Sequence, residues 1–343
     1  MTESTVHMLD EIREAPQAVA RQQQALAGPI KDLVARLKKK PPQIVVTCAR
    51  GSSAHAATYG KFLIERYLRI PVAAAAPSIA SVYRQQLQLD GQLFLAISQS
   101  GRSDDLVEQA KSAKAAGAIT AAIINADKTP LGAACDIVLP MQAGPELSVA
   151  ATKTFVAALS ALARLAAAWT GDAALDAAVA RLPERLDDAF VLDWSAGLGA
   201  LIEAKSLITI GRGPTLAIAR EASLKLKETC NLHAEAFSGA EFMHGPVALV
   251  STQYPILLFM PTDAAGAGLA QLASDLRGKG AALLSTEPGE PRAGRLPALP
   301  TDHHDTDAIC LIQSFYVFAV RLAQRLGTDV DRPRHLQKVT RTR

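Results

Sequence analysis

The sequence predicts an α/β protein made of two tandem domains, each a parallel β-sheet with helices on both faces. Three observations predict this fold class. Short apolar runs rich in β-branched residues alternate with helical stretches. Some of these runs end in a tight glycine turn that opens a helix, which is how a βαβ unit begins. The same order of elements then recurs in the second half of the chain.

The first half contains five predicted strands. The first is Ile44–Cys48, which ends at a glycine turn before an alanine-rich helical stretch. The others are expected at residues 72–75, 93–98, 119–125 and 137–140. Ahead of them, residues 8–39 have a helical pattern, and we expect Gly28 and Pro29 to break that helix.

The second half repeats this plan at a nearly constant distance along the chain. Arg212 lies 162 positions after Arg50, and each follows an apolar run. The same shift carries Ser98 to Met260, and both of these end apolar runs. Such a shift indicates a duplicated domain. After Ser98 the first copy keeps a turn rich in hydroxyl groups that the second copy lacks, so an anion site at this turn would belong to the first copy.

Composition excludes several classes of function. The chain has 36 basic and 33 acidic residues and a formal net charge of +3, so nucleic acid is not an expected partner. The most apolar run, Phe155–Trp169, contains Arg164 and is too short to span a bilayer, so we expect a buried helix and no membrane partner. The polar N-terminus does not resemble a signal peptide.

The cysteines give no sign of a metal or disulfide framework. Four of them lie far apart along the chain: Cys48, Cys135, Cys230 and Cys310. We expect reduced, mostly buried thiols in a cytoplasmic protein, with no metal and no other cofactor.

The loop Ser98–Ser103 joins a buried strand to the start of a helix. Free backbone N–H groups and the helix dipole favour an anion at such a place. Gly101 allows a sharp turn, and the three serine hydroxyls add donors. An alternative is that Ser100 or Ser103 only caps the helix, but a cap accounts for one serine rather than three. We predict that the loop binds phosphate, with Ser53 lining the same crevice after the first strand.

A second candidate site lies on the helical stretch that ends at Glu228. Glu221, Lys225 and Glu228 are spaced i, i+4, i+7 and share one helix face. A solvent-facing ladder of ion pairs has the same spacing and is, taken alone, an equally good interpretation. The stretch follows the turn 211–213, which places its start at the ligand-binding edge of the second sheet. A carboxylate there can move a proton between adjacent sugar carbons, and an ammonium can stabilise an enolate.

Two histidines follow this helix. The turn at Gly245-Pro246 predicts that His244 is accessible. An imidazole can open a sugar ring by carrying a proton from the anomeric hydroxyl to the ring oxygen. We favour a structural hydrogen bond for His233, whereas structural and catalytic interpretations of His244 both stay open.

Together these motifs resemble the SIS (sugar isomerase) family, and most closely the isomerase half of glucosamine-6-phosphate synthases. The matching pieces are Ser98–Gly101, Val149–Lys153, Leu224–Glu228, His233–Ala236, His244–Pro246 and Asp329–Arg334 with Lys338. The resemblance implies two tandem SIS domains of the flavodoxin-like, three-layer type. Arg50 and Ala151 depart from the family's usual residues.

The resemblance also implies roles for matching positions. Contacts to the sugar phosphate would come from Ser53, Ser98, Gln99, Ser100, Ser103, Val149 and Glu221. Glu228 would move the proton between C1 and C2 of the sugar, and His244 would open the ring. Lys225 would lie in the site, while Lys338 would close over the sugar and form an imine with a keto sugar. A homodimer is implied in which the neighbouring subunit supplies His244.

These expectations divide the chain into five parts. They are an N-terminal helical segment (1–40), a phosphate-binding SIS domain (41–170), a helical connector (171–195), a second SIS domain with the catalytic helix and histidine loop (196–328), and a tail that closes the site (329–343). Within the second domain, residues 286–306 are rich in proline, glycine and charge and are expected to form a surface loop.

The reaction direction follows from one comparison. In the synthases a glutaminase domain, with a catalytic cysteine just after the initiator methionine, precedes this half, whereas residue 2 here is Thr2. We therefore expect no glutamine hydrolysis and expect the deamination of glucosamine 6-phosphate to fructose 6-phosphate and ammonia. Two alternatives remain. Another phosphosugar isomerase or a deglycase would share this chemistry, and a non-catalytic sugar-phosphate sensor would need the serine loop but neither Glu228 nor His244.

Overall fold

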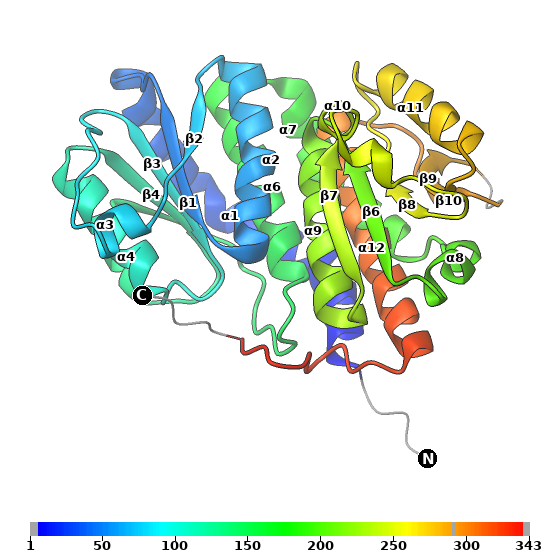
Figure 1. The fold of residues 1–343 in the computed structure, drawn as a ribbon. Helices are drawn as coiled ribbons and strands as arrows, with labels where there is room; N and C mark the ends of the chain where they lie inside the picture. Colours follow the sequence, from blue (N-terminus) through cyan, green and yellow to red (C-terminus); the bar gives the residue numbers. More distant parts are fainter. Residues whose placement is uncertain (1–5, 290–292, 339–343) are drawn as a thin grey trace. The chain divides into compact units, whose positions relative to one another are not determined.

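The computed structural model describes residues 6–289 and 293–338, and the chain forms two compact units. The first-sheet unit comprises Gln17–Glu146, Lys153–Ala180 and the tail from Gln337. The second-sheet unit comprises the residues up to Pro16, Leu147–Thr152 and Arg181–Leu336. Each unit is built on one five-stranded parallel sheet (Figure 1).

The two sheets have the same topology. The first contains β1 (Val45–Ala49), β2 (Val72–Ala74), β3 (Leu93–Ser98), β4 (Ile119–Ile124) and β5 (Ile137–Pro140), in the order β2-β1-β3-β4-β5. The second contains β6 (Ser206–Gly211), β7 (His233–Ser238), β8 (Pro255–Leu258), β9 (Ala282–Pro288) and β10 (Arg295–Ala298), in the order β10-β9-β8-β6-β7. Counted from the other edge, the second order repeats the first strand for strand. The predicted α/β fold with two parallel sheets is therefore confirmed.

Helices cover both faces of the first sheet. The connection from β1 to β2 runs in one direction and the connections toward β3 and β4 run in the other, so right-handed crossovers place α2 (Gly51–Leu68) and α4 (Asp104–Ala115) on opposite faces. Alternate strand residues such as Phe94 and Ala122 pack with Leu106 of α4 in one buried cluster. The remaining helices of this unit are α3 (Ser78–Ser81), α5 (Pro130–Ala134) and α6 (Lys153–Thr170), and α6 is the buried helix that its apolar sequence predicts.

The second sheet is covered in the same way. Ile208 and Ile256 pack with Leu272 of α11 (Gly266–Gly278), while α9 (Pro214–Cys230) and α12 (His304–Leu326) pack against each other. Shorter elements complete this unit: η1 (Ser195–Gly197), α8 (Leu198–Ile202), α10 (Gly239–Phe242) and η2 (Pro246–Leu249). By length and composition α12 alone among the described helices could cross a membrane, but 89% of its apolar window is buried, as in a core helix of a soluble protein.

Helix α1 (His7–Lys39) is continuous, so the expected break at Gly28-Pro29 is wrong. Leu26 and Ile30, on either side of that pair, are both buried. Tertiary packing of this face offsets the hydrogen bond that a proline removes from a helix.

The expected surface loop at 286–306 is wrong in part. β9 extends to Pro288, β10 runs from Arg295 to Ala298, and α12 begins at His304. Pro297 is compatible with β10 because this edge strand pairs with β9 alone.

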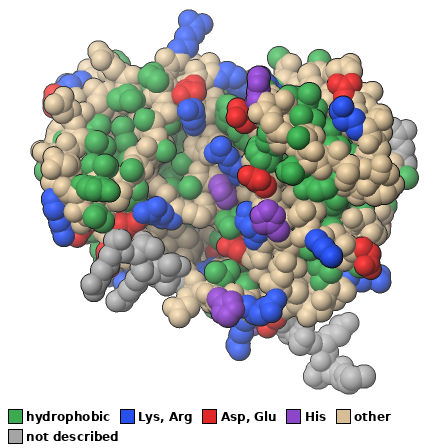
Figure 2. All heavy atoms as spheres, viewed as in Figure 1, with side chains coloured by type: hydrophobic (Ala, Val, Ile, Leu, Met, Phe, Trp, Pro, Cys, Tyr) green, Lys and Arg blue, Asp and Glu red, His purple; other side chains and the backbone are tan. Residues whose placement is uncertain are grey.

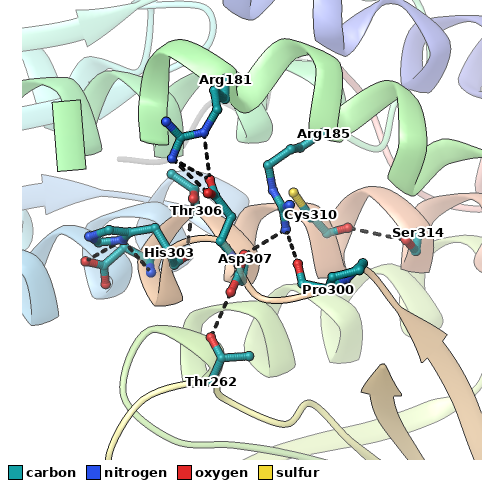
Figure 3. A network of polar contacts seen from close by, with 11 residues as sticks. Arg181, Arg185, Thr262, Pro300, His303, Thr306, Asp307, Cys310 and Ser314 are labelled. Carbon is teal, nitrogen blue, oxygen red and sulfur yellow. Dashed lines mark hydrogen bonds and ion pairs between the residues drawn. The ribbon is translucent and has the colours of Figure 1, made fainter. Parts of the chain in front are cut away.

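Two arginines tie α7 (Ala173–Phe190) to the start of α12 (Figure 3). Arg185 lies 2.8 Å from Asp307, whose other oxygen accepts a 2.9 Å hydrogen bond from Thr262. One turn earlier, Arg181 pairs with Asp302 at 2.8 Å. The first pair is largely buried and borders a cavity of about 240 Å³ at the ends of β8, β9 and β10.

All four cysteines are buried and unpaired, which confirms the expectation of free thiols. Burial raises the pKa of Cys48, Cys135 and Cys310 to about 12 and that of Cys230 to about 11. Figure 2 shows basic side chains dispersed among acidic and hydrophobic ones over the face in view, as the balanced charge leads one to expect.

Candidate functional site

The loop between β3 and α4 turns at a position where only glycine fits. Gly101 has a φ of +61°, a region that L side chains rarely adopt. A Cβ built at this position would lie 2.5 Å from Oγ1 and 2.7 Å from Cβ of Thr129. Thr129 is itself held in place, because its Oγ1 accepts a hydrogen bond from Gly132 N at the start of α5.

Backbone hydrogen bonds fix the same loop to the segment after β4. The carbonyl of Gln99 accepts from Asn125 N (3.3 Å) and Ala126 N (3.2 Å). The carbonyl of Gly101 accepts from Leu131 N at 3.1 Å. These bonds hold the loop in one conformation before any ligand arrives, as a preorganised anion site requires.

The serine hydroxyls of the loop have distinct surroundings. Ser98 Oγ accepts from Gly101 N at 3.0 Å, and Ser100 Oγ accepts from Arg102 N at 3.3 Å, so both stabilise the turn. Ser103 occupies the N-cap position of α4, yet its side chain makes no capping hydrogen bond. The interpretation of Ser103 as a simple cap is therefore wrong.

Arg50 brings a positive charge to the same edge of the first sheet, because β1 and β3 are neighbours in it. Its Nε and Nη2 donate to Oδ2 of Asp105 at 3.1 and 2.7 Å. Asp105 is buried in the first turn of α4, whereas 54% of the Arg50 side chain is exposed. Ser53 lies half-buried in the first turn of α2.

Lys338 belongs to a buried polar cluster of the first-sheet unit. Its Nζ lies 2.8 Å from Oε2 of Glu146, a residue with no exposed side chain. Glu146 also accepts from Thr154 N (3.1 Å) and from Thr154 Oγ1 (2.8 Å), at the start of α6. A carboxylate is stabilised by a helix N-terminus, so this cluster gives the tail a defined anchor.

The three charged residues of α9 form a buried cluster. Lys225 Nζ lies 3.4 Å from Oε1 of Glu221 and donates a hydrogen bond to Oε2 of Glu228. The side chains of Glu221 and Lys225 are fully buried, and 20% of the Glu228 side chain is exposed. The interpretation as a solvent-facing ladder of ion pairs is therefore wrong.

The position of this cluster differs from the expectation. α9 begins at Pro214, after β6, and Glu228 lies 14 residues later, about 20 Å along the helix axis. The cluster therefore does not lie at the carboxyl edge of the second sheet. Instead, Glu228 borders a cavity of about 370 Å³ formed with Asn231 and residues 326–329 and 332–334.

His244 lies in the turn after α10 and is exposed, as predicted. Its neighbour Met243 lines a cavity together with Arg212, which follows β6, so this turn lies at the carboxyl edge of the second sheet. Glu228 lies near the opposite end of the same sheet, because α9 leads into the start of β7. Within one chain, the second-sheet unit therefore keeps these two residues apart.

Asp331 organises the segment that contains Val149. Its carboxylate accepts hydrogen bonds from His7 N (2.9 Å), Met8 N (2.8 Å) and Ser148 Oγ (3.0 Å). Its carbonyl accepts from Val149 N at 3.1 Å. Asp331 thus caps α1 and fixes residues 147–152 of the second-sheet unit.

Known proteins resemble this chain over nearly its whole length. The SIS domain family matches residues 37–168 and 200–285. The chain belongs to the SIS domain family. This SIS protein is 33% identical, over 97% of its length, to a glutamine–fructose-6-phosphate aminotransferase of Gluconobacter oxydans, of which it covers 58%. The chain thus spans a little more than half of such relatives, and it is homologous to their SIS half.

Two solved structures resemble the SIS protein closely. A candidate phosphosugar isomerase from Silicibacter pomeroyi DSS-3 is 43% identical, with a TM-score of 0.90 over 95% of this chain and 100% of that one. The C-terminal domain of a glucosamine-fructose-6-phosphate aminotransferase from Francisella tularensis is 26% identical, with a TM-score of 0.85 over 96% and 99%. The family resemblance that the sequence motifs predicted is confirmed.

Sequence reasoning on this SIS protein missed several polar residues next to the predicted site. Thr129 buttresses the serine loop, Asp105 holds Arg50, and Glu146 holds Lys338. Thr129 had a local signal, because a threonine before proline is a common helix start. The two ion pairs join residues far apart in the chain, and no local pattern reveals them.

Proposed function

We propose that this chain is a phosphosugar isomerase that works as a deaminase, converting glucosamine 6-phosphate to fructose 6-phosphate and ammonia. The observation that supports this most is the buried cluster on α9. A buried ammonium between two carboxylates, of which only Glu228 reaches solvent, is a costly arrangement that a purely structural role does not require. It suits a carboxylate that must accept and return a proton at a fixed position.

In this proposal the serine loop holds the phosphate. The rigid turn at Gly101, the Ser103 hydroxyl that caps nothing and the start of α4 together supply donors without requiring the loop to move. Ser53, Ser98, Gln99 and Ser100 complete the set.

The chemistry then needs only protons and water. His244 opens the pyranose ring by moving the anomeric hydroxyl proton to the ring oxygen. Glu228 takes the proton from C2 of the open-chain aldehyde while O1 gains a proton, which gives a C1–C2 enolamine. Glu228 then returns the proton to C1 and the nitrogen loses one proton, which gives the C2 imine of fructose 6-phosphate. Water adds to the C2 imine, and the C–N bond breaks to release ammonia and fructose 6-phosphate.

The direction of the reaction is supported by the thiols. Transfer of an amide nitrogen from glutamine uses a reactive thiolate, and such thiols have low pKa values. All four cysteines of these 343 residues are buried with raised pKa values, so none of them suits that role. The buried thiols therefore fit a reaction that uses free ammonia. Free thiols also fit a cytoplasmic location.

We further propose that the protein is a homodimer in which each subunit supplies His244 to its partner's site. Within one chain His244 and Glu228 lie near opposite ends of the second sheet. His244 is exposed, and so are its apolar neighbours Met243 and Leu249, by 48% and 54%. An exposed turn of this kind can enter a second copy of the chain.

The remaining predicted residues take supporting roles in this proposal. Glu221 and Lys225 hold Glu228, and the segment at Val149, fixed by Asp331, contributes backbone contacts to the sugar. Lys338 leaves its pair with Glu146 when it forms an imine with a keto sugar.

The test is a coupled assay of ammonia and fructose 6-phosphate with the purified protein and glucosamine 6-phosphate. We expect equal amounts of both products, and loss of activity in Glu228→Gln. Glu203→Gln, which changes an exposed carboxylate at the end of α8, serves as the matched control and keeps full activity. Release of no ammonia, with Glu228→Gln and wild type alike on every phosphosugar tried, would contradict the proposal.

A second candidate is an aldose–ketose phosphosugar isomerase that releases no ammonia. The 43% identity to a candidate phosphosugar isomerase over nearly the whole chain favours it. Interconversion of a phosphosugar pair without an amino group, abolished by Glu228→Gln, would select this candidate. Tight binding of a sugar phosphate without any turnover would instead indicate a sensor.

Subunit mixing tests the shared site. Glu228→Gln and His244→Asn are each inactive, but a mixed dimer holds one intact site if His244 acts across the interface. Reassociating equal amounts then restores about a quarter of the wild-type activity, since half of the dimers are mixed. No recovery, with mixed dimers demonstrated by differential tagging, would place both residues in one chain's site.

A further inference from the structure

The α9 cluster extends into helix α12 through one further side chain. Tyr316 is fully buried, and its hydroxyl donates a 3.2 Å hydrogen bond to Oε1 of Glu221. Glu221 lies beside Lys225, and Lys225 beside Glu228. A continuous polar chain therefore leads from the core of the second-sheet unit to the carboxylate that reaches solvent.

A tyrosine suits this position because it gives Glu221 a hydrogen bond without adding a charge. Glu221, Lys225 and Glu228 together carry one positive and two negative charges. A buried carboxylate is costly unless hydrogen bonds satisfy its oxygens. A phenol is a neutral donor, so it adds a hydrogen bond to the same Oε1 of Glu221 that lies beside Lys225, without adding a charge to the cluster.

We propose that Tyr316 is a positioning residue for proton transfer. Its hydroxyl fixes the Glu221 carboxylate, Glu221 fixes the Lys225 ammonium, and Lys225 holds Glu228 where it meets the substrate. This inference rests on the proposed function, in which Glu228 moves the proton. Tyr316 itself touches no substrate.

Tyr316 is packed rigidly enough to fix the position of the Glu221 carboxylate. It lies in the middle of α12, a helix whose residues from Asp305 to Val320 are all buried. Its ring lies 6.3 Å from that of Phe315 in a tilted arrangement, so packing restricts both side chains. A rigid donor fixes its acceptor, whereas a mobile one would not.

The opposing interpretation is that Tyr316 only fills space in the core. Phenylalanine has nearly the same volume and shape, so Tyr316→Phe separates the two roles. It removes one oxygen and leaves the packing of the ring in place.

The test compares Tyr316→Phe with wild type and with Tyr254→Phe. Tyr254 is the matched control, because its hydroxyl lies 3.5 Å from Ser206 Oγ at the start of β6, in the same unit but away from α9. We expect kcat of Tyr316→Phe to fall about tenfold with KM within about twofold of wild type, because Glu228 loses alignment while the phosphate contacts remain. Tyr254→Phe keeps both constants.

A double-mutant cycle shows whether Tyr316 acts through Glu221. If it does, adding Tyr316→Phe to Glu221→Gln lowers kcat no further, because the link is already broken. A full additional tenfold loss in the double variant would overturn the proposed route.

Failure of this inference can be told from failure of the proposed function. If wild type turns over phosphosugars, Glu228→Gln is inactive and Tyr316→Phe has wild-type kinetics, the positioning role is wrong and the function stands. If wild type turns over none, the function is wrong and the inference falls with it. A crystal structure of Tyr316→Phe gives a readout without activity: Lys225 Nζ displaced from Glu228 supports the role, and an unchanged cluster overturns it.

Discussion

Replacement of Gly101 by alanine is the sharpest perturbation of the serine loop. At a φ of +61° an L residue is strained by about 1 kcal/mol. The new Cβ would also lie 2.5–2.9 Å from three side-chain atoms of Thr129, well inside contact distance. Thr129 moves away only by giving up its hydrogen bond with Gly132 N, so the overpacking adds about 1–3 kcal/mol. We therefore expect Gly101→Ala to lose about 2–4 kcal/mol of unfolding free energy.

The control variant Gly144→Ala separates the cost of the positive φ from the cost of the clash with Thr129. Gly144 belongs to the same unit and has a φ of +70°, but a Cβ there meets nothing within 4 Å. This control should lose only about 1 kcal/mol, measured by urea denaturation. Calorimetric titration with fructose 6-phosphate should show weaker binding to Gly101→Ala, by about tenfold or more, and unchanged binding to Gly144→Ala. Equal stability of the two variants together with wild-type affinity in both would refute the account of this loop.

Three further predictions concern stability and reactivity. Asp307→Ala leaves the largely buried Arg185 cation without its carboxylate and should cost about 3–5 kcal/mol in urea denaturation. Asp302→Ala breaks the more exposed pair with Arg181 and should cost less than about 1 kcal/mol, and similar losses in the two variants would contradict this reasoning. Partial burial acts to raise the pKa of Asp136, but hydrogen bonds from Lys114 and Thr120 outweigh it and lower that pKa. The ionised group therefore stabilises the fold at pH values above its unfolded pKa, and this stabilisation is lost as the pH falls. Stability of the wild type should therefore decline more steeply below about pH 4 than that of Asp136→Asn, and parallel curves would be the contrary result. Because all four thiols are buried with raised pKa values, a thiol reagent at pH 8 should label the native protein only as fast as it unfolds, and rapid labelling of any one cysteine would show otherwise.

Much of the fold could be predicted because its signals are local. The bounds of β3 agree with an apolar run in the sequence, since a central strand of a parallel sheet is apolar throughout. The bounds of the edge strand β5 agree with their apolar run as well. The duplication predicts that the two sheets share one strand order, as they do.

The elements that were missed lie where local signals are weak. β7 (His233–Ser238) and β10 are edge strands, and an edge carries polar residues or a proline such as Pro297. The continuity of α1 through Pro29 depends on the packing of its buried face, which composition does not report.

The candidate site likewise has parts that the sequence predicts and parts that it does not. The serine loop and the α9 residues could be predicted because each is a short motif with its own spacing. The links from Asp105 to Arg50, from Glu146 to Lys338 and from Tyr316 to Glu221 join residues 55, 192 and 95 positions apart, so only the folded chain reveals them. The depth of Glu228 along α9 was also misjudged, because a turn fixes where a helix begins but not which part of it meets the substrate.

The central claim is that Glu228 moves a proton between C2 and C1 of a bound amino-sugar phosphate. It is tested most directly by running the reaction with glucosamine 6-phosphate in deuterated water and measuring deuterium at C1 of the fructose 6-phosphate formed. The proton held by Glu228 exchanges with solvent before it reaches C1, because 20% of that side chain is exposed. We therefore expect partial incorporation with the wild type and with Glu203→Gln, and none above the enzyme-free blank with Glu228→Gln. Incorporation by Glu228→Gln at the wild-type rate would contradict the account.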